Sequence, residues 1–264
     1  MHCRNKFLIV FISLIFVLSL AGCQSKSLPQ GEGAVWNLVV IGDSSLWGVG
    51  EAYAALIEAD LGVNVEVDDF AVGSASAGKV RDVLQGDETT SLQYEKLPEV
   101  VKEAEVVIMF LNPFDSINPQ KPLNFEACFL SDGPPAICDL NGMKQWIADL
   151  NAIWGEIIRL RDGKPIILRA TDLYNPLVSP WKEAGIFEAC TACWETMSSA
   201  ARQAAAVYNI PLLSQLDVLN GPNHDEDPRE KGYIQEDGQH LSELGIQRIA
   251  EALAAMGYEP TELP

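Results

Sequence analysis

The chain has 264 residues, of which 48% are hydrophobic, so it can bury the core of one sizeable domain and is not intrinsically disordered. Its 37 acidic residues outnumber 18 basic ones, and the formal net charge of -19 would repel a polyphosphate backbone. This balance argues against a nucleic-acid partner. Glycine and proline recur with no fixed period, which argues against collagen-like and solenoid repeats.

The N-terminal residues are typical of a secretory signal. Two cations, Arg4 and Lys6, precede an apolar stretch over residues 7–20 that is short for a bilayer span. The stretch ends in Leu20-Ala21-Gly22-Cys23, which resembles the bacterial lipobox, where a signal peptidase cuts before a cysteine that then carries lipid. The alternative is an ordinary signal peptide or an uncleaved anchor with a chance cysteine.

The lipobox resemblance implies a lipid-anchored, extracytoplasmic protein of the bacterial cell envelope. Residues 1–22 would be the signal peptide. Residues 23–35 would be the lipidated Cys23 and a flexible tether, because this stretch lacks apolar periodicity. Residues 36–264 would form the folded domain, and the membrane would be a partner through the N-terminal lipid.

Four further cysteines, an even number, fit the oxidising compartment that export implies. We expect pairing between neighbours in the sequence, Cys128 with Cys138 and Cys190 with Cys193, although spacing alone leaves the connectivity open. The alternative for the second pair is a redox site or half a zinc site. A zinc site would need a second Cys or His pair nearby, and the sequence offers none.

Short apolar runs alternate with helical stretches along the chain. Strands are predicted over residues 36–41, 63–67, 106–111, 165–168 and, weakly, 210–213. Helices are predicted over residues 49–59, 77–84, 92–103, 142–161 and 187–208, and a last helix over 242–256 has an apolar face. This order predicts an α/β three-layer sandwich with a five-stranded parallel, flavodoxin-like sheet.

Two long connections, over residues 113–141 and 214–240, are expected to frame the functional site, since such loops usually have a function. The first contains Phe114, Phe125 and Phe129, and the second is rich in acidic residues, glycine and proline.

Ligands of open parallel sheets bind outside the carboxyl ends of the strands. The polar residues that follow the predicted strands include Ser44, Asn112 and the pair Asp237 and His240. A serine hydroxyl becomes a nucleophile when an imidazole takes its proton, and a carboxylate orients that imidazole. These residues therefore predict acyl transfer. His224, in a solvated acidic loop, is the less suitable histidine.

The first and last of these segments resemble blocks of the SGNH, or GDSL-type, hydrolase superfamily. Gly42-Asp43-Ser44-Ser45 is similar to the first block, with Ser45 where leucine is commoner. Asp237-x-x-His240 matches the last block. The resemblance implies that Ser44 is the nucleophile, His240 the general base and Asp237 the acid of a catalytic triad.

The two middle blocks appear in the right order but are weaker. Residues 69–74 are similar to the second block, and either Gly73 or Ser74 is the candidate for its oxyanion-binding amide. Phe110-Leu111-Asn112-Pro113 keeps only the asparagine of the third block, which usually reads Gly-x-Asn-Asp. The resemblance implies that Asn112 also binds the oxyanion, while its neighbours indicate an altered substrate cleft.

We therefore predict a secreted, lipid-anchored serine esterase that forms an acyl-enzyme and needs no cofactor or metal. Members of the superfamily act on lipids, thioesters, small esters and acetylated sugars, so an acylated glycan, lipid or small ester is the expected substrate. One alternative is a non-catalytic ligand-binding lipoprotein on a degenerate SGNH fold. Another is an interaction lipoprotein that uses its acidic face.

Each motif also has a purely structural interpretation. Gly-Asp-Ser after a strand can be a turn, Asn112 a loop cap, and Asp237 with His240 a helix entry. We expect Trp47 and Trp181 to be packing residues, with a role in lining the site as the alternative.

Overall fold

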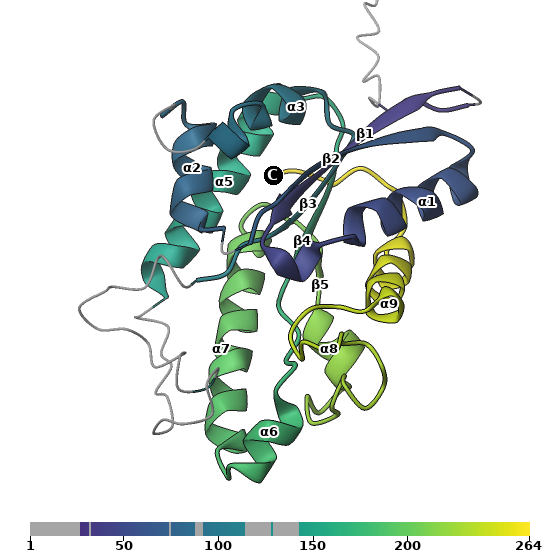
Figure 1. Cartoon of the computed structure of the whole chain (residues 1–264). Helices are drawn as coiled ribbons and strands as arrows, with labels where there is room; N and C mark the ends of the chain where they lie inside the picture. The colour runs from purple at the N-terminus through teal and green to yellow at the C-terminus, as the bar shows by residue number, and fades with distance from the viewer. Residues whose placement is uncertain (1–26, 32, 74, 88–91, 114–127, 129–142) are drawn as a thin grey trace, which may run out of the picture.

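The computed structural model describes residues 27–31, 33–73, 75–87, 92–113, 128 and 143–264. The predicted signal peptide, Cys23, Ser74 and Cys138 lie outside the described residues, as do Phe114, Phe125 and Phe129. Figure 1 shows a central sheet with helices on both sides. Within the described part of the chain, no helix is both long enough and apolar enough to cross a bilayer.

The sheet has five parallel strands in the order β2-β1-β3-β4-β5, which confirms the predicted fold class. The central strands β1 (Val35–Gly42), β3 (Val106–Phe110) and β4 (Ile167–Thr171) are almost wholly buried, as their apolar sequences require when helices cover both faces. β2 (Asn64–Ala71) forms one edge and is only partly buried, so it tolerates polar residues. β5 (Leu212–Leu213) forms the other edge.

The helices form two layers (Figure 1). On one face, α1 (Val49–Leu61) packs against α9 (Glu243–Ala254), whose residues Ile249, Ala250 and Leu253 are buried as the sequence pattern predicts. On the other face, α5 (Lys144–Arg161) packs against its neighbours α2 (Ala77–Leu84), α3 (Leu97–Glu103) and α7 (Phe187–Ala206). Two short helices that the sequence did not predict, α6 (Val178–Glu183) and α8 (Gln215–Asn220), lie in the connections around β5.

The packed part of the chain begins before Trp36. The Leu28 side chain is buried in the core, and Trp36 Nε1 donates a hydrogen bond of 2.8 Å to the Pro29 carbonyl. The residues immediately before β1 are therefore held against the body of the domain.

The cysteine pairing differs from the prediction. Cys128 forms a disulfide with Cys190, across a sequence separation of 62 residues, so neither predicted local pair forms. Cys193 is also disulfide-bonded. The prediction was wrong because it used sequence spacing alone: Cys190 and Cys193 lie one turn apart in α7, and the chain brings Cys128 back to that helix with a Cα–Cα distance of 5.6 Å.

The disulfide between Cys128 and Cys190 should contribute strongly to stability, because it closes a long loop in the unfolded chain. In the chain-entropy model, replacing both cysteines by serine should lower the free energy of unfolding by about 4 kcal/mol. Urea denaturation of the double variant and the wild type measures the difference. An unchanged unfolding midpoint would contradict this pairing.

Candidate active site

Ser44 is presented by a tight turn at the carboxyl end of β1. It begins a short 3-10 helix, η1 (Ser44–Leu46), and the Asp43 side chain caps this helix by accepting a 2.8 Å hydrogen bond from the Ser45 amide. The turn requires a small residue at Gly42, because a Cβ atom there would lie 2.7 Å from Leu46 Cδ1 and 3.1 Å from the Phe110 carbonyl. The sequence of the turn thus places Ser44 at the edge of the sheet where ligands bind.

Asn112 is held beside this turn by the same carboxylate. It follows β3, and its Nδ2 donates a 2.8 Å hydrogen bond to Asp43 Oδ2. Both side chains are buried, and burial raises the pKa of Asp43, although the hydrogen bonds from Ser45 and Asn112 oppose this effect. Asp43 thus fixes the position of Asn112 relative to the turn that carries Ser44, a contact that a simple turn would not need.

Asp237 and His240 form the predicted pair at the start of α9. Asp237 Oδ2 lies 2.6 Å from His240 Nδ1, while Oδ1 accepts hydrogen bonds from the amides of Gln239 (2.9 Å) and His240 (3.0 Å). These bonds lower the pKa of Asp237 to about 2, and the bond from the Gln239 amide has the largest effect. Gly238 has a φ of +74°, so a residue that readily adopts the left-handed region lets the chain turn between the two side chains.

The loop that carries this pair is tied to the body of the protein. The Tyr174 hydroxyl donates a 2.8 Å hydrogen bond to the Gln239 carbonyl, and Arg229 Nη2 donates one of 2.7 Å to the Gly238 carbonyl. Burial raises the pKa of Tyr174, which keeps the phenol in its donating form. Two successive carbonyls in the middle of the turn are therefore held in place.

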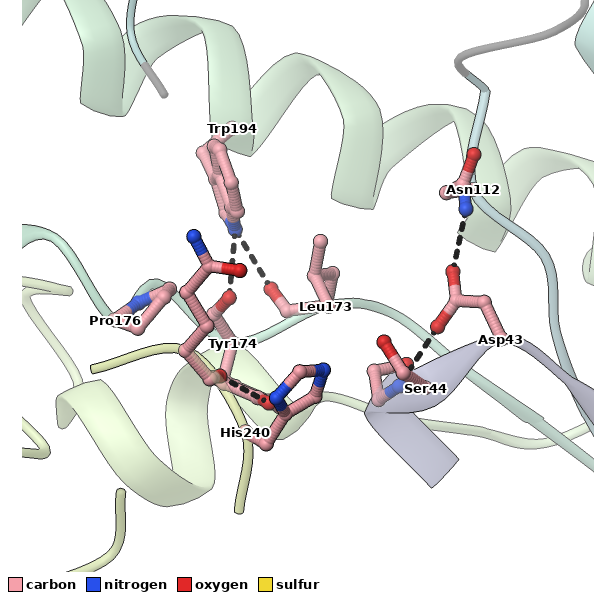
Figure 2. A pocket seen from close by; sticks show the side chains of 10 residues that line it. Asp43, Ser44, Asn112, Leu173, Tyr174, Pro176, Trp194 and His240 are labelled. Atoms are coloured by element: carbon pink, nitrogen blue, oxygen red, sulfur yellow. Dashed lines mark hydrogen bonds between the residues drawn. The ribbon is translucent and has the colours of Figure 1, made fainter. Parts of the chain in front are cut away.

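These elements meet at one cavity of about 210 Å³ (Figure 2). The imidazole of His240 points toward Ser44 across the cavity, although no hydrogen bond joins their side chains in this structure. Such bonds are often long in a free enzyme and tighten when substrate binds. The residues that line the cavity are Asp43, Ser44, Ser45, Asn112, Leu173, Tyr174, Pro176, Trp194, Gln239 and His240.

Some predicted residues lie elsewhere. Gly73 follows β2 at the same edge of the sheet but is not among the residues that line the cavity. His224 is bound by two other carboxylates, those of Glu195 (3.1 Å) and Asp217 (2.8 Å). Trp181 is a buried packing residue, as predicted, whereas Trp47 is 44% exposed and stacks on His240.

The sequence prediction missed the wall of the cavity formed by Leu173, Tyr174 and Pro176. These residues follow β4, so the same rule about carboxyl ends would have found them. The strand predicted from the sequence ends at Leu168, before the buried Arg169, so it stops short of the true end of β4 and of the residues that follow it.

No group of three or more histidine, cysteine, aspartate and glutamate residues that could hold a metal ion occurs among the residues described here. The residues that line the cavity include hydroxyl, amide, imidazole and carboxylate side chains, and groups of these kinds are suited to proton transfer and acyl transfer.

Comparison with known proteins identifies the fold. No protein-family model matches the chain, and no curated protein matches it. The structure is similar to the lipase Lip_vut3 from a goat rumen metagenome, with a TM-score of 0.60 and 20% identity, over 86% of this chain and 100% of that one. It is also similar to a variant of Axe2, an acetyl xylan esterase from Geobacillus stearothermophilus, with a TM-score of 0.51 and 15% identity, over 86% and 97% of the two chains. The chain thus shares the α/β fold of these two proteins, with the five-stranded parallel sheet that the order of predicted strands and helices indicated.

The lowered pKa of Asp237 predicts that its carboxyl carbon titrates near pH 2 in a carbon-13 NMR titration, below the ordinary value of 3.8. Because the ionised form receives the hydrogen bonds, its contribution to stability is present above the ordinary pKa and is lost as the pH falls through about 2. His240→Ala should keep part of the shift, since the Gln239 amide is its largest cause. A titration at the ordinary value in the wild type would contradict this geometry.

Proposed function

We propose that this protein is a serine esterase that hydrolyses carboxylic esters through an acyl-enzyme. The observation that supports it most directly is that Ser44, Asn112 and His240, which are far apart in the sequence, line one cavity. Asp237 is hydrogen-bonded to Nδ1 of His240. A serine, an imidazole and a carboxylate in this order are the components of nucleophilic acyl transfer.

In the proposed mechanism, Ser44 Oγ attacks the acyl carbonyl while His240 Nε2 takes the hydroxyl proton. The Asp237 carboxylate accepts the hydrogen bond from Nδ1, which fixes the imidazole tautomer and stabilises the imidazolium. When the tetrahedral intermediate collapses, His240 gives the proton to the leaving alkoxide and the acyl group stays on Ser44. Water then gives a proton to His240 and attacks the acyl carbon, and His240 returns that proton to Ser44 Oγ as the bond to the acyl group breaks and the acid leaves.

The oxyanion of the tetrahedral intermediate needs hydrogen-bond donors. We assign this role to the Ser44 amide and the Asn112 side chain, with the Gly73 or Ser74 amide as the third donor. Asn112 already lies beside the turn that carries Ser44, because its side chain and the Ser45 amide both donate hydrogen bonds to the Asp43 carboxylate. In other hydrolases, one such donor contributes about 10² to 10³ in rate.

For the substrate, we propose an acylated glycan, a lipid or a small ester. The similar structures are a lipase and an acetyl xylan esterase, which share the fold at 15 to 20% identity. The scheme requires no cofactor or metal ion.

For the location, we propose a bacterial cell envelope, with the domain outside the cytoplasm and Cys23 carrying the lipid. The lipobox-like sequence supports this proposal, and the disulfide between Cys128 and Cys190 is in keeping with an oxidising compartment. Because Leu28 is already packed in the domain, the spacer between lipid and body would be only a few residues long.

The alternative is a non-catalytic ligand-binding lipoprotein on the same fold. One observation favours it: the Asn112 amide donates to Asp43, in a segment where Phe110 and Pro113 depart from the usual block. This protein would bind a ligand in the cavity without turnover.

A fluorophosphonate probe distinguishes the two functions. We expect the purified protein to be labelled at Ser44 alone, because only an activated serine reacts, and peptide mass mapping measures the site. Labelling should be lost in Ser44→Ala and in His240→Ala. It should persist in Ser45→Ala, a matched control in the same turn. A folded wild-type protein that is not labelled would support the ligand-binding alternative.

The role of Asp237 predicts a large loss of rate without loss of folding. Asp237→Asn replaces the acceptor of the His240 Nδ1 bond by an amide and should lower kcat by roughly 10³ to 10⁴. Steady-state hydrolysis of a short acyl ester measures the change. Asp225→Asn, at an exposed carboxylate in the same connection, should leave kcat unchanged. Wild-type turnover in Asp237→Asn would refute the triad assignment.

A further inference from the structure

The geometry points to Trp47 as a positioning residue for His240, an inference that rests on the esterase function proposed above. The indole and imidazole rings are stacked, with centroids 4.9 Å apart and an interplanar angle of 18°. Trp47 belongs to the turn of the nucleophile, and its amide donates a hydrogen bond of 3.4 Å to the Ser44 carbonyl. One short segment thus carries both the nucleophile and the ring that contacts the base.

The indole itself is fixed by the end of β2. Trp47 Nε1 donates a 2.9 Å hydrogen bond to the Ala71 carbonyl. A Cβ atom at Gly73 would lie 3.5 Å from the Cζ2 atom of the indole, so the ring also lies against this turn. Trp47 therefore links the segments after β1 and β2 to the loop of His240.

The stack has a function because the pair of Asp237 and His240 is open to solvent. Their side chains are 45% and 29% exposed. Water screens the attraction between the carboxylate and the imidazole, so burial does not fix the ring as it does in a closed site. Tyr174 and Arg229 hold only the backbone of the loop. The bond to Asp237 holds one edge of the imidazole, and the flat indole surface adds a second contact that restricts its rotation, so that Nε2 is presented to Ser44.

The Trp47 side chain is not part of the hydrophobic core. The Trp47 side chain is 44% exposed, so its removal leaves no cavity in the core. The indole surface also faces the site where positive charge develops on the imidazole during both proton transfers, and an aromatic face attracts a cation. The attraction grows as the charge develops, and an oriented imidazole serves the proton transfers rather than substrate binding, so the loss of Trp47 should change kcat rather than KM.

The test compares Trp47→Leu with Trp47→Phe. Leucine keeps apolar bulk without a flat ring, and should lower kcat for a short acyl ester by roughly 10- to 100-fold, with little change in KM. Phenylalanine can still stack on His240 and should restore most of kcat, although it cannot donate to Ala71. Val207→Ala, at a side chain that is 56% exposed at the end of α7, is the matched control and should leave kcat unchanged.

Proton NMR of the His240 ring gives a readout that does not depend on turnover. The stacked indole should shift the ring protons upfield in the wild type and in Trp47→Phe, and this shift should disappear in Trp47→Leu. Wild-type kcat in Trp47→Leu, or a loss of kcat with unchanged His240 signals, would overturn the proposal. If the wild type hydrolyses no ester, the proposed function fails, while the NMR signals still decide whether Trp47 holds the imidazole.

Discussion

The buried carboxylate of Asp43 is the contact on which the geometry of the site depends. One oxygen accepts a hydrogen bond from the Ser45 amide, and the other accepts one from the Asn112 side chain. A single carboxylate thus joins the turn after β1 to the segment after β3. A buried carboxylate is unfavourable unless hydrogen bonds satisfy it, and here they come from the segments that follow β1 and β3, which are neighbours in the sheet. The hydrogen bonds that the buried Asp43 carboxylate requires therefore fix the relative positions of the turn that carries Ser44 and of Asn112.

The other half of the site is assembled differently. Asp237 and His240 lie on an exposed loop, which Tyr174 and Arg229 fix through its backbone and Trp47 fixes through the imidazole ring. The site thus combines a rigid, buried edge of the sheet with a loop held by a few specific contacts. The exposed carboxylate keeps its charge because amides of its own loop donate to it, and burial contributes little.

The sequence was informative wherever the structure depends on local pattern. Apolar runs located the parallel strands, and short motifs located Ser44, Asn112 and the Asp237–His240 pair, because each follows a strand or begins a helix. It failed where a distant contact determines the outcome. Arg169 interrupts the apolar run of β4, yet it is buried because its guanidinium donates to the carbonyls of Leu168 and Gly257, the latter after α9. The disulfide between Cys128 and Cys190 is a second example, because sequence spacing does not show where a long connection comes back to the domain.

The central claim is that these segments form one site complementary to a tetrahedral intermediate. The most direct measurement is a crystal structure of the protein with a phosphonate bound to Ser44, since the phosphonyl group mimics that intermediate. We expect one phosphonyl oxygen about 2.7 to 3.1 Å from Asn112 Nδ2 and from the Ser44 amide, with His240 Nε2 on the opposite side facing the leaving-group position. An adduct whose oxygens face solvent, with Asn112 turned away, would contradict it.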